Sequence, residues 1–165
     1  MDKPKIHIRK ATAEDQNTIW DILAPTIAAG DTLAFATDSP KADMIDFWCG
    51  PDKYTYVAEL GGEVVGTFFM KANQPGQGAH VVNAGYVTNP QHRGKGLARA
   101  MCAFSLTEAK ELGFTHMQYN IVVKSNERAI KLWQDMGFEI VGEIPEVFNH
   151  RQLGLTNAYV MWRRL

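Results

Sequence analysis

Cysteine is scarce in this sequence of 165 residues, which contains only Cys49 and Cys102. Two thiols so far apart do not suggest a disulfide framework, and no Cys/His cluster has the spacing of a zinc site. Positive charge is not in excess either, because 17 basic residues face 18 acidic ones and the formal net charge is -1. That balance argues against a nucleic-acid binder that relies on a basic face. The composition therefore predicts a protein of the reducing cytoplasm, with no metal site and no nucleic-acid partner.

Long apolar runs are missing as well. No segment approaches the roughly 18 continuous apolar residues of a membrane helix, and the start from Met1 to Arg9 lacks the apolar stretch of a signal peptide. We therefore expect neither insertion into a membrane nor export. The length suits one domain, so a single domain over residues 1–165 is predicted.

Hydrophobic patterning predicts alternating strands and helices. The expected strands are 6–9, 54–60, 64–70, 80–87, 116–123, 138–141 and 158–162. The expected helices begin at Thr12, at Ser39-Pro40, at Leu97 and at Ser125 or Asn126. The first of them is expected to run as far as Ala29, although Pro25 could break or kink it. Residues 30–37 are expected to form an exposed connecting loop. The predicted order is β-α-α-β-β-β-α-β-α-β-β.

The most informative segment is Asn89 to Ala98, where a polar turn containing glycine follows an apolar strand and opens into an amphipathic helix. Gly94 and Gly96 have no Cβ, so the backbone can approach a ligand closely and direct free N–H groups at it from the positive end of the helix. This arrangement suits a phosphorylated ligand. It is neither a nucleoside-triphosphate P-loop nor a Rossmann turn, because the spacing and the position in the chain differ.

The spacing Gln91-x-x-Gly94-x-Gly96 resembles the acetyl-CoA signature of the GCN5-related N-acetyltransferase (GNAT) family. A second motif, Asn126-x-x-Ala129-x-x-Leu132-Trp133-x-x-x-Gly137-Phe138, resembles the family's helix after the fifth strand. The order of elements also matches, so the resemblance covers nearly the whole chain. It implies an α/β (α+β) domain with a mixed, mostly antiparallel sheet of about seven strands, splayed fourth and fifth strands, and helices on both faces.

The same resemblance implies acetyl-CoA as co-substrate. The backbone of Arg93, Gly94, Lys95, Gly96, Leu97 and Ala98 would hold the pyrophosphate, with added charge from Arg93 and Lys95. Tyr86, Val87 and Thr88 fall where the fourth strand turns its backbone toward the thioester, and the N–H of Val87 is expected to bond the acetyl carbonyl. Asn126 is expected to cap the last helix, to contact CoA, or to do both.

Proton transfer is harder to assign. Trp133 stands where many family members carry Tyr as general acid, and an indole cannot act as an acid near neutral pH. Tyr86 and Tyr119 are alternatives, and the acid stays unassigned. Residues 80–87 contain no Asp or Glu, so His80 is the remaining candidate base, acting through water, unless it is structural.

The acceptor side is indicated by Asn83 and Asn120, which interrupt apolar strands on either side of the expected splay. Strand parity allows both to face a shared cavity that holds the acceptor, or both could bond stray backbone groups. The loop 28–35 resembles the acceptor-side loop of the phosphinothricin and amino-acid N-acyltransferase group. Segments 80–86 and 118–120 resemble fungal enzymes that acetylate proline analogues.

Near the end, Phe148 to Arg151 is expected to lie in a connection that approaches the acceptor in these relatives. There His150 and Arg151 could meet a carboxylate or be solvated. Cys102 lies within an apolar helix stripe and is a poor nucleophile. The resemblance therefore implies direct transfer of acetyl to the amine of a small molecule, an amino acid or analogue, by a possible homodimer. The alternatives are a protein N-terminus or lysine as acceptor, and an acyl-CoA-binding module without turnover.

Overall fold

The computed structural model describes residues 5–165, so the part of the N-terminal prediction that rests on residues 1–4 lies outside the described residues. The elements are β1 (Ile6–Lys10), η1 (Ala13–Asp15), α1 (Gln16–Ala29), α2 (Lys41–Trp48), β2 (Tyr54–Leu60), β3 (Glu63–Ala72), η2 (Gly76–Gly78), β4 (Val81–Thr88), η3 (Pro90–His92), α3 (Leu97–Glu111), β5 (His116–Val123), α4 (Glu127–Asp135), β6 (Glu139–His150) and β7 (Gly154–Arg164). The predicted order of strands and helices is confirmed. Among the described residues, no helix combines the length and apolar character needed to span a membrane.

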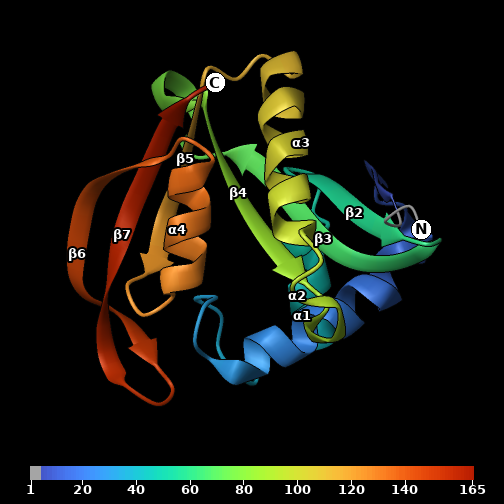
Figure 1. Ribbon diagram of the computed structural model, residues 1–165, viewed down its shortest axis with the longest axis horizontal. Helices are drawn as coiled ribbons and strands as arrows, with labels where there is room; N and C mark the ends of the chain where they lie inside the picture. The colour runs from blue at the N-terminus through green and yellow to red at the C-terminus, as the bar shows by residue number, and fades with distance from the viewer. Residues whose placement is uncertain (1–4) are drawn as a thin grey trace.

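The seven strands form one sheet in the order β1-β2-β3-β4-β5-β7-β6 (Figure 1). Every neighbouring pair is antiparallel except β4 and β5, which are parallel. These two strands pair only at Val81 with His116 and at Val82 with Met117. Beyond those residues they diverge, so the expected splay is confirmed.

Helices cover both faces of the sheet and enclose two apolar clusters. One cluster contains Met101 and Trp133 of α3 and α4, packed on strand residues such as Phe68. The other contains Ile22 and Trp48 of α1 and α2, packed on the opposite face. Tyr86 packs against the first cluster and its neighbour Val87 belongs to the second, because successive side chains of a strand point to opposite faces. Strand β4 therefore contributes to both layers.

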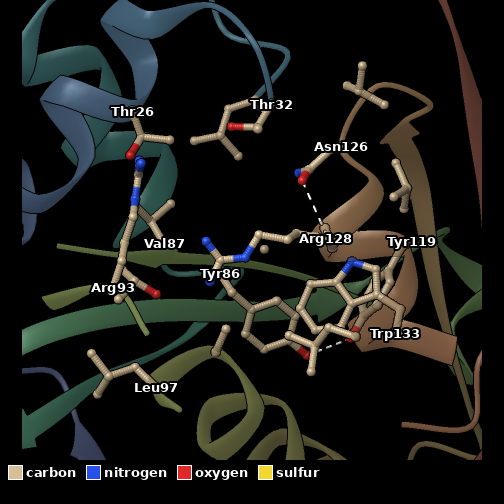
Figure 2. A pocket seen from close by; sticks show the side chains of 18 of the residues that line it. Thr26, Thr32, Tyr86, Val87, Arg93, Leu97, Tyr119, Asn126, Arg128 and Trp133 are labelled. Carbon is tan, nitrogen blue, oxygen red and sulfur yellow. Dashed lines mark hydrogen bonds between the residues drawn. The ribbon is translucent and has the colours of Figure 1, made fainter. Parts of the chain in front are cut away.

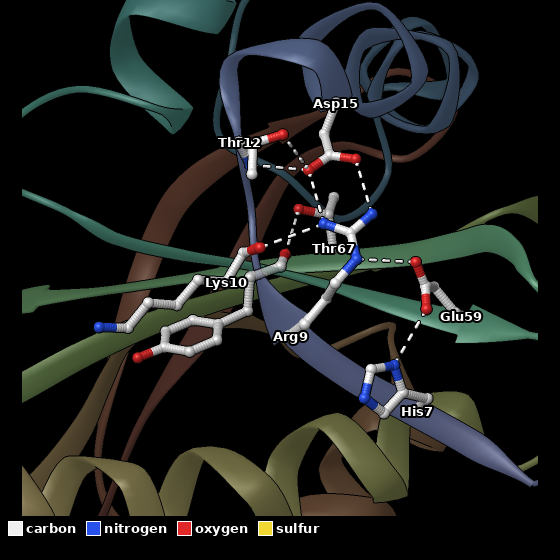
Figure 3. A network of polar contacts seen from close by, with 8 residues as sticks. His7, Arg9, Lys10, Thr12, Asp15, Glu59 and Thr67 are labelled. Carbon is white, nitrogen blue, oxygen red and sulfur yellow. Dashed lines mark hydrogen bonds and ion pairs between the residues drawn. The ribbon is translucent and has the colours of Figure 1, made fainter.

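A partly exposed guanidinium joins β1 to β2 and to the start of the first helix (Figure 3). Arg9 donates from Nη1 and Nη2 to Asp15 at 2.8 and 3.0 Å, and from Nε to Glu59 at 2.7 Å. Asp15 also accepts from the backbone N–H of Thr12 at 2.7 Å, which completes a capping box. The Arg9 hydrogen bonds lower the pKa of Asp15 to about 2.

The predicted ranges of two strands and the predicted exposure of one loop are wrong, whereas the predicted end of the first helix at Ala29 is confirmed. Strands β6 and β7 are much longer than 138–141 and 158–162, because register shifts between Ile140 and Gly142 and between Ile144 and Phe148 interrupt the side-chain alternation of β6. Helix α1 continues through Pro25 to Ala29. The loop 30–37 is only partly exposed, since Gly30 is buried and the Phe35 ring packs 5.0 Å from that of Phe47.

Candidate active site

A cavity of about 700 Å³ occupies the splay between β4 and β5 (Figure 2). Its walls are the second halves of these strands, the first turns of α3 and α4, the end of α1 and the loop residues Asp31, Thr32 and Leu33. Segments between Thr26 and Trp133 that are far apart in the sequence therefore meet around one space, which passes from one helical layer to the other.

The glycine turn forms the wall next to α3. Gly94 and Gly96 have φ of 77° and 79°, in the left-handed region that favours glycine, and Gly96 is the N-cap of α3. A Cβ at either position would meet no atom within 4 Å, so the backbone here faces open space. No side chain caps the helix, which leaves its first N–H groups free for an anion. Of the six residues expected to hold pyrophosphate, all but Lys95 line the cavity.

Strand β4 presents an open backbone edge to the cavity. Asn73 N donates to Val81 O and Asn89 N donates to Val65 O, both at 2.8 Å, so the odd-numbered residues of β4 direct their N–H and C=O groups at β3. Because these groups alternate along a strand, those of Tyr86 and Thr88 point to the diverging β5 side. The expectation for Val87 is therefore wrong: it pairs with Thr67 of β3, and the free amides are those of Tyr86 and Thr88.

Positive charge surrounds the cavity. Arg93, Arg99 and Arg128 all line it. Arg99 is paired with Asp135 at 3.1 Å, whereas Arg128 extends from α4 into the cavity and Arg93 reaches toward Thr26 at the end of α1 (Figure 2). Arg128 was not among the site residues predicted from the sequence, although its place in the first turn after Asn126 could have indicated it. His92, whose Nδ1 is buried without a hydrogen-bond partner, was not among them either.

The Trp133 side chain, on α4, forms another part of the cavity wall. Its indole packs 5.2 Å from the Tyr86 ring and 5.0 Å from the Tyr119 ring. Beneath it the Tyr86 hydroxyl lies 2.6 Å from Ser105 Oγ and 2.9 Å from the Tyr119 hydroxyl. Burial raises the pKa of both phenols well above the ordinary value. Both hydroxyls are thus committed to a buried network, which makes them weak candidates for the acid.

Asn126 caps α4 and lines the cavity. Its Oδ1 accepts from the backbone N–H of Ala129 at 3.3 Å (Figure 2), which is the expected capping role. The side-chain amide nitrogen takes no part in that bond and stays available for a ligand.

The three residues predicted to be catalytic do not line the cavity. Asn83 Nδ2 donates to Gln118 O at 2.9 Å, across the point where β4 and β5 begin to separate and the backbone carbonyl loses its strand partner. Asn120 Nδ2 donates to Asn73 Oδ1 at 2.7 Å. The shared-cavity placement is therefore wrong, and for Asn83 the bond to a stray backbone group is the one observed.

His80 lies just before β4, at the paired end of β4 and β5 and away from the divergent end where the cavity is. Its ring packs edge-on against that of His116, with centroids 5.7 Å apart, and its backbone carbonyl accepts from Thr115 N at 3.0 Å. This placement gives no geometric support to a role as base.

Phe148 to His150 belongs to β6 rather than to a connection. His150 is buried, and its Nδ1 accepts from the backbone N–H groups of Gln152 and Leu153 at 3.1 Å each. Arg151 donates from Nη1 to Ala28 O at 2.6 Å and from its backbone N–H to Gly30 O at 3.0 Å. These two side chains thus hold the β6–β7 turn and fasten it to the end of α1. Neither predicted role fits the buried His150, whereas Arg151 is exposed to solvent, which was one of the two alternatives.

Comparison with known proteins agrees with this geometry. The model of the acetyltransferase (GNAT) family matches residues 19–138. A GCN5-related N-acetyltransferase from Kribbella flavida is 35% identical, with a TM-score of 0.91 over 97% of this chain and 98% of that one. A phosphinothricin acetyltransferase from Sinorhizobium meliloti, solved in complex with acetyl-CoA, is 23% identical, with a TM-score of 0.85 over 97% of this chain and 88% of that one, a likeness of fold alone.

A curated relative, the N-acetyltransferase aca1 of Schizosaccharomyces pombe, is 31% identical over 111 residues. The match covers 67% of this chain and 53% of that protein, so the chain spans about half the length of this relative.

Proposed function

The chain belongs to the acetyltransferase (GNAT) family, and from this premise we propose that it transfers acetyl from acetyl-CoA directly to the amine of a small molecule, an amino acid or a close analogue. The observation that carries the proposal is the continuity of one cavity from the uncapped first turn of α3 to the open backbone edge of β4. Such a cavity fits a long ligand with phosphate at one end and a chain that can pair with a strand.

The charge around the cavity and its free backbone groups support the following position for the donor. The pyrophosphate of CoA would accept from the amides of the first α3 turn and from Arg128, with Arg93 close by. From there the pantetheine arm would run along β4, using the open groups of Thr88 and then Tyr86. Tyr86 lies deeper in the splay than Thr88, so its N–H is the donor we assign to the acetyl carbonyl and to the oxyanion that develops there.

The reaction needs no enzyme nucleophile. The amine nitrogen attacks the thioester carbon, the new C–N bond forms, the C–S bond breaks, and CoA leaves as thiolate. Cys102 is buried, and burial raises the pKa of its thiol to about 11, which argues against a covalent intermediate. With both buried phenols committed to Ser105 and to each other, we propose that water or the proton lost by the amine protonates the thiolate.

We prefer a small acceptor because the space in the cavity is limited. The cavity of about 700 Å³ must hold both the acyl end of CoA and the acceptor, and the loop after α1 closes one side of it. A protein N-terminus or lysine would need an open groove for its chain. The likeness in fold to phosphinothricin acetyltransferases supports the same choice.

A thiol-release assay tests the proposal. Purified protein and acetyl-CoA are mixed with the twenty L-amino acids, spermidine, kanamycin and an unstructured peptide, while calorimetry measures CoA binding separately. CoA release that depends on amino acids supports the proposal. Release with the peptide alone favours a protein acceptor, and tight CoA binding without release from any amine favours a binding module.

A homodimer is the assembly we propose, because the edge strand β6 exposes Ile140, Val141, Ile144 and Val147. Light scattering measures the oligomeric state directly, and a monomer at high concentration would contradict it. A cytoplasmic location and the lack of a metal requirement remain predictions.

A further inference from the structure

Asp31 is the only carboxylate among the described residues that line the cavity. The other charged groups there are Arg93, Arg99 and Arg128, with His92 as the only imidazole. The guanidinium groups match the negative charge of CoA. An acceptor amine arrives at neutral pH as an ammonium, for which only Asp31 offers the opposite charge.

Contacts made by the preceding residues Gly30 and Ala28 fix the backbone that carries Asp31. Asp31 follows Gly30, the left-handed C-cap of α1 (φ 63°), where a Cβ would lie 2.8 Å from Thr37 Cγ2 and 3.1 Å from Arg151 Cβ. The backbone O of Gly30 accepts from Arg151 N at 3.0 Å, and Ala28 O accepts from the Arg151 guanidinium at 2.6 Å. The carboxylate is therefore carried by a fastened turn, as a preorganised binding group requires.

The Asp31 side chain is also free to meet a ligand. None of the ion pairs found within residues 5–165 includes it, and it is half-buried at the cavity wall. The aliphatic part of the Arg151 side chain lies against the neighbouring Gly30, and its guanidinium donates to Ala28 O.

We propose that Asp31 binds the ammonium of the acceptor and accepts the proton that the amine must lose before it attacks the thioester. The proposal rests on the function proposed above and names the acceptor class as a cationic amine. One proton passes from the ammonium to the Asp31 carboxylate and then to water, the nitrogen lone pair forms the C–N bond, the C–S electron pair leaves with CoA, and the second proton that the nitrogen loses protonates the CoA thiolate. This supplies the base that β4 lacks.

His92 is the other proton acceptor in the cavity, but its place favours a different role. It belongs to the turn before α3, on the phosphate side, and its Nε2 lies 3.7 Å from Glu63 Oε2. Asp31 instead lies on the loop after α1, outside the glycine turn that we propose to bind the phosphates.

The test compares Asp31→Asn with Asp38→Asn, an exposed acid of the same loop that does not line the cavity. Acceptors are the L-amino acids and spermidine of the panel, and methoxyamine, which is uncharged near neutral pH. For the charged amines, D31N should raise KM and lower kcat, so that kcat/KM falls by roughly 100-fold. Methoxyamine should be affected much less, D31E should recover part of the activity, and D38N should match the wild type.

The affinity for CoA and the thermal midpoint, measured by calorimetry, should stay unchanged in D31N. A D31N enzyme as active as D38N overturns the proposal, and so does an equal loss with methoxyamine and with charged amines. If the wild type binds CoA but no amine releases it, the function proposed above fails and the role of Asp31 fails with it. Normal turnover that D31N does not change is a different result: it overturns the role of Asp31 and leaves the proposed function intact.

Discussion

The hydroxyl oxygens of Tyr86 and Tyr119 lie 2.9 Å apart and join β4 to β5 where the backbones of these strands no longer pair. Trp133 covers this bridge from α4, and Ser105 anchors it to α3 at 2.6 Å from the Tyr86 hydroxyl. Side-chain hydrogen bonds thus replace the backbone hydrogen bonds that β4 and β5 no longer form with each other. The splay can therefore hold a cavity without separating the two halves of the sheet.

Tyr119→Phe should separate the structural role of this bridge from a catalytic one. Losing the hydroxyl removes one buried hydrogen bond, which should lower the free energy of unfolding by about 1 kcal/mol. We expect kcat for acetyl transfer to remain close to that of the wild type, because the phenol is committed below the indole. Urea unfolding and thiol release measure the two effects. A fall in kcat of about 100-fold with unchanged stability would make Tyr119 the acid.

Gly96→Ala should weaken acetyl-CoA binding. A left-handed residue with a Cβ costs about 1–2 kcal/mol, and here the added methyl also enters the space where the phosphates would lie. Gly113→Ala is the matched control, because its φ of 94° gives the same kind of strain at a site that does not line the cavity. Both variants should lose stability to urea, whereas only Gly96→Ala should lose affinity by calorimetry. Equal affinities would count against the phosphate site.

Arg128→Met should raise the dissociation constant for CoA by roughly 10- to 100-fold, since a hydrogen bond to a charged group is worth about 1.5–3 kcal/mol. The effect should shrink as salt is added, because screening weakens the attraction to phosphate. Lys131→Met removes a cation from the same helix at a position that is outside the cavity wall. If this control weakens binding as much as Arg128→Met does, the effect is one of net charge and not of a specific contact.

Acid should weaken the Arg9–Asp15 contact of Figure 3. The pKa of Asp15 is lowered to about 2, mainly by the hydrogen bonds from Arg9, and this corresponds to roughly 2 kcal/mol of stability. Because the folded-state pKa lies below the unfolded one, that stability is present above about pH 4 and is lost as the pH falls toward 2.

Urea unfolding at several pH values tests this prediction. Asp15→Asn should be about 2 kcal/mol less stable than the wild type at neutral pH, and the difference should close toward pH 2. Asp38→Asn, in an exposed turn, should show no such difference. A gap between Asp15→Asn and the wild type that persists to pH 2 would mean that the ionised pair is not its source.

Much of the fold could be predicted from the sequence, because the residue patterns that indicate strands, helices and turns are local. Alternation and helical periodicity placed β5 and α3 within a residue or two, and the glycines marked the turn before α3. The failures have local causes too. Two register shifts broke the pattern of β6, whereas the predicted end of α1 at Ala29 is confirmed despite Pro25, because Ile22, Leu23 and Ile27 bury the apolar face of the helix in the core.

The sequence by itself determined the family and the glycine turn before α3, because glycine spacing, helix caps and strand order are properties of neighbouring residues. Only the tertiary structure decided which side chains share the cavity. It brought Asp31 and Arg128 from distant segments to one space, turned the amides of Tyr86 and Thr88 rather than Val87 toward it, and left Asn83, Asn120 and His80 outside. The reason is physical: the direction of a strand's backbone groups and the meeting of remote charges depend on which strands pair and where they part, and no local pattern records that.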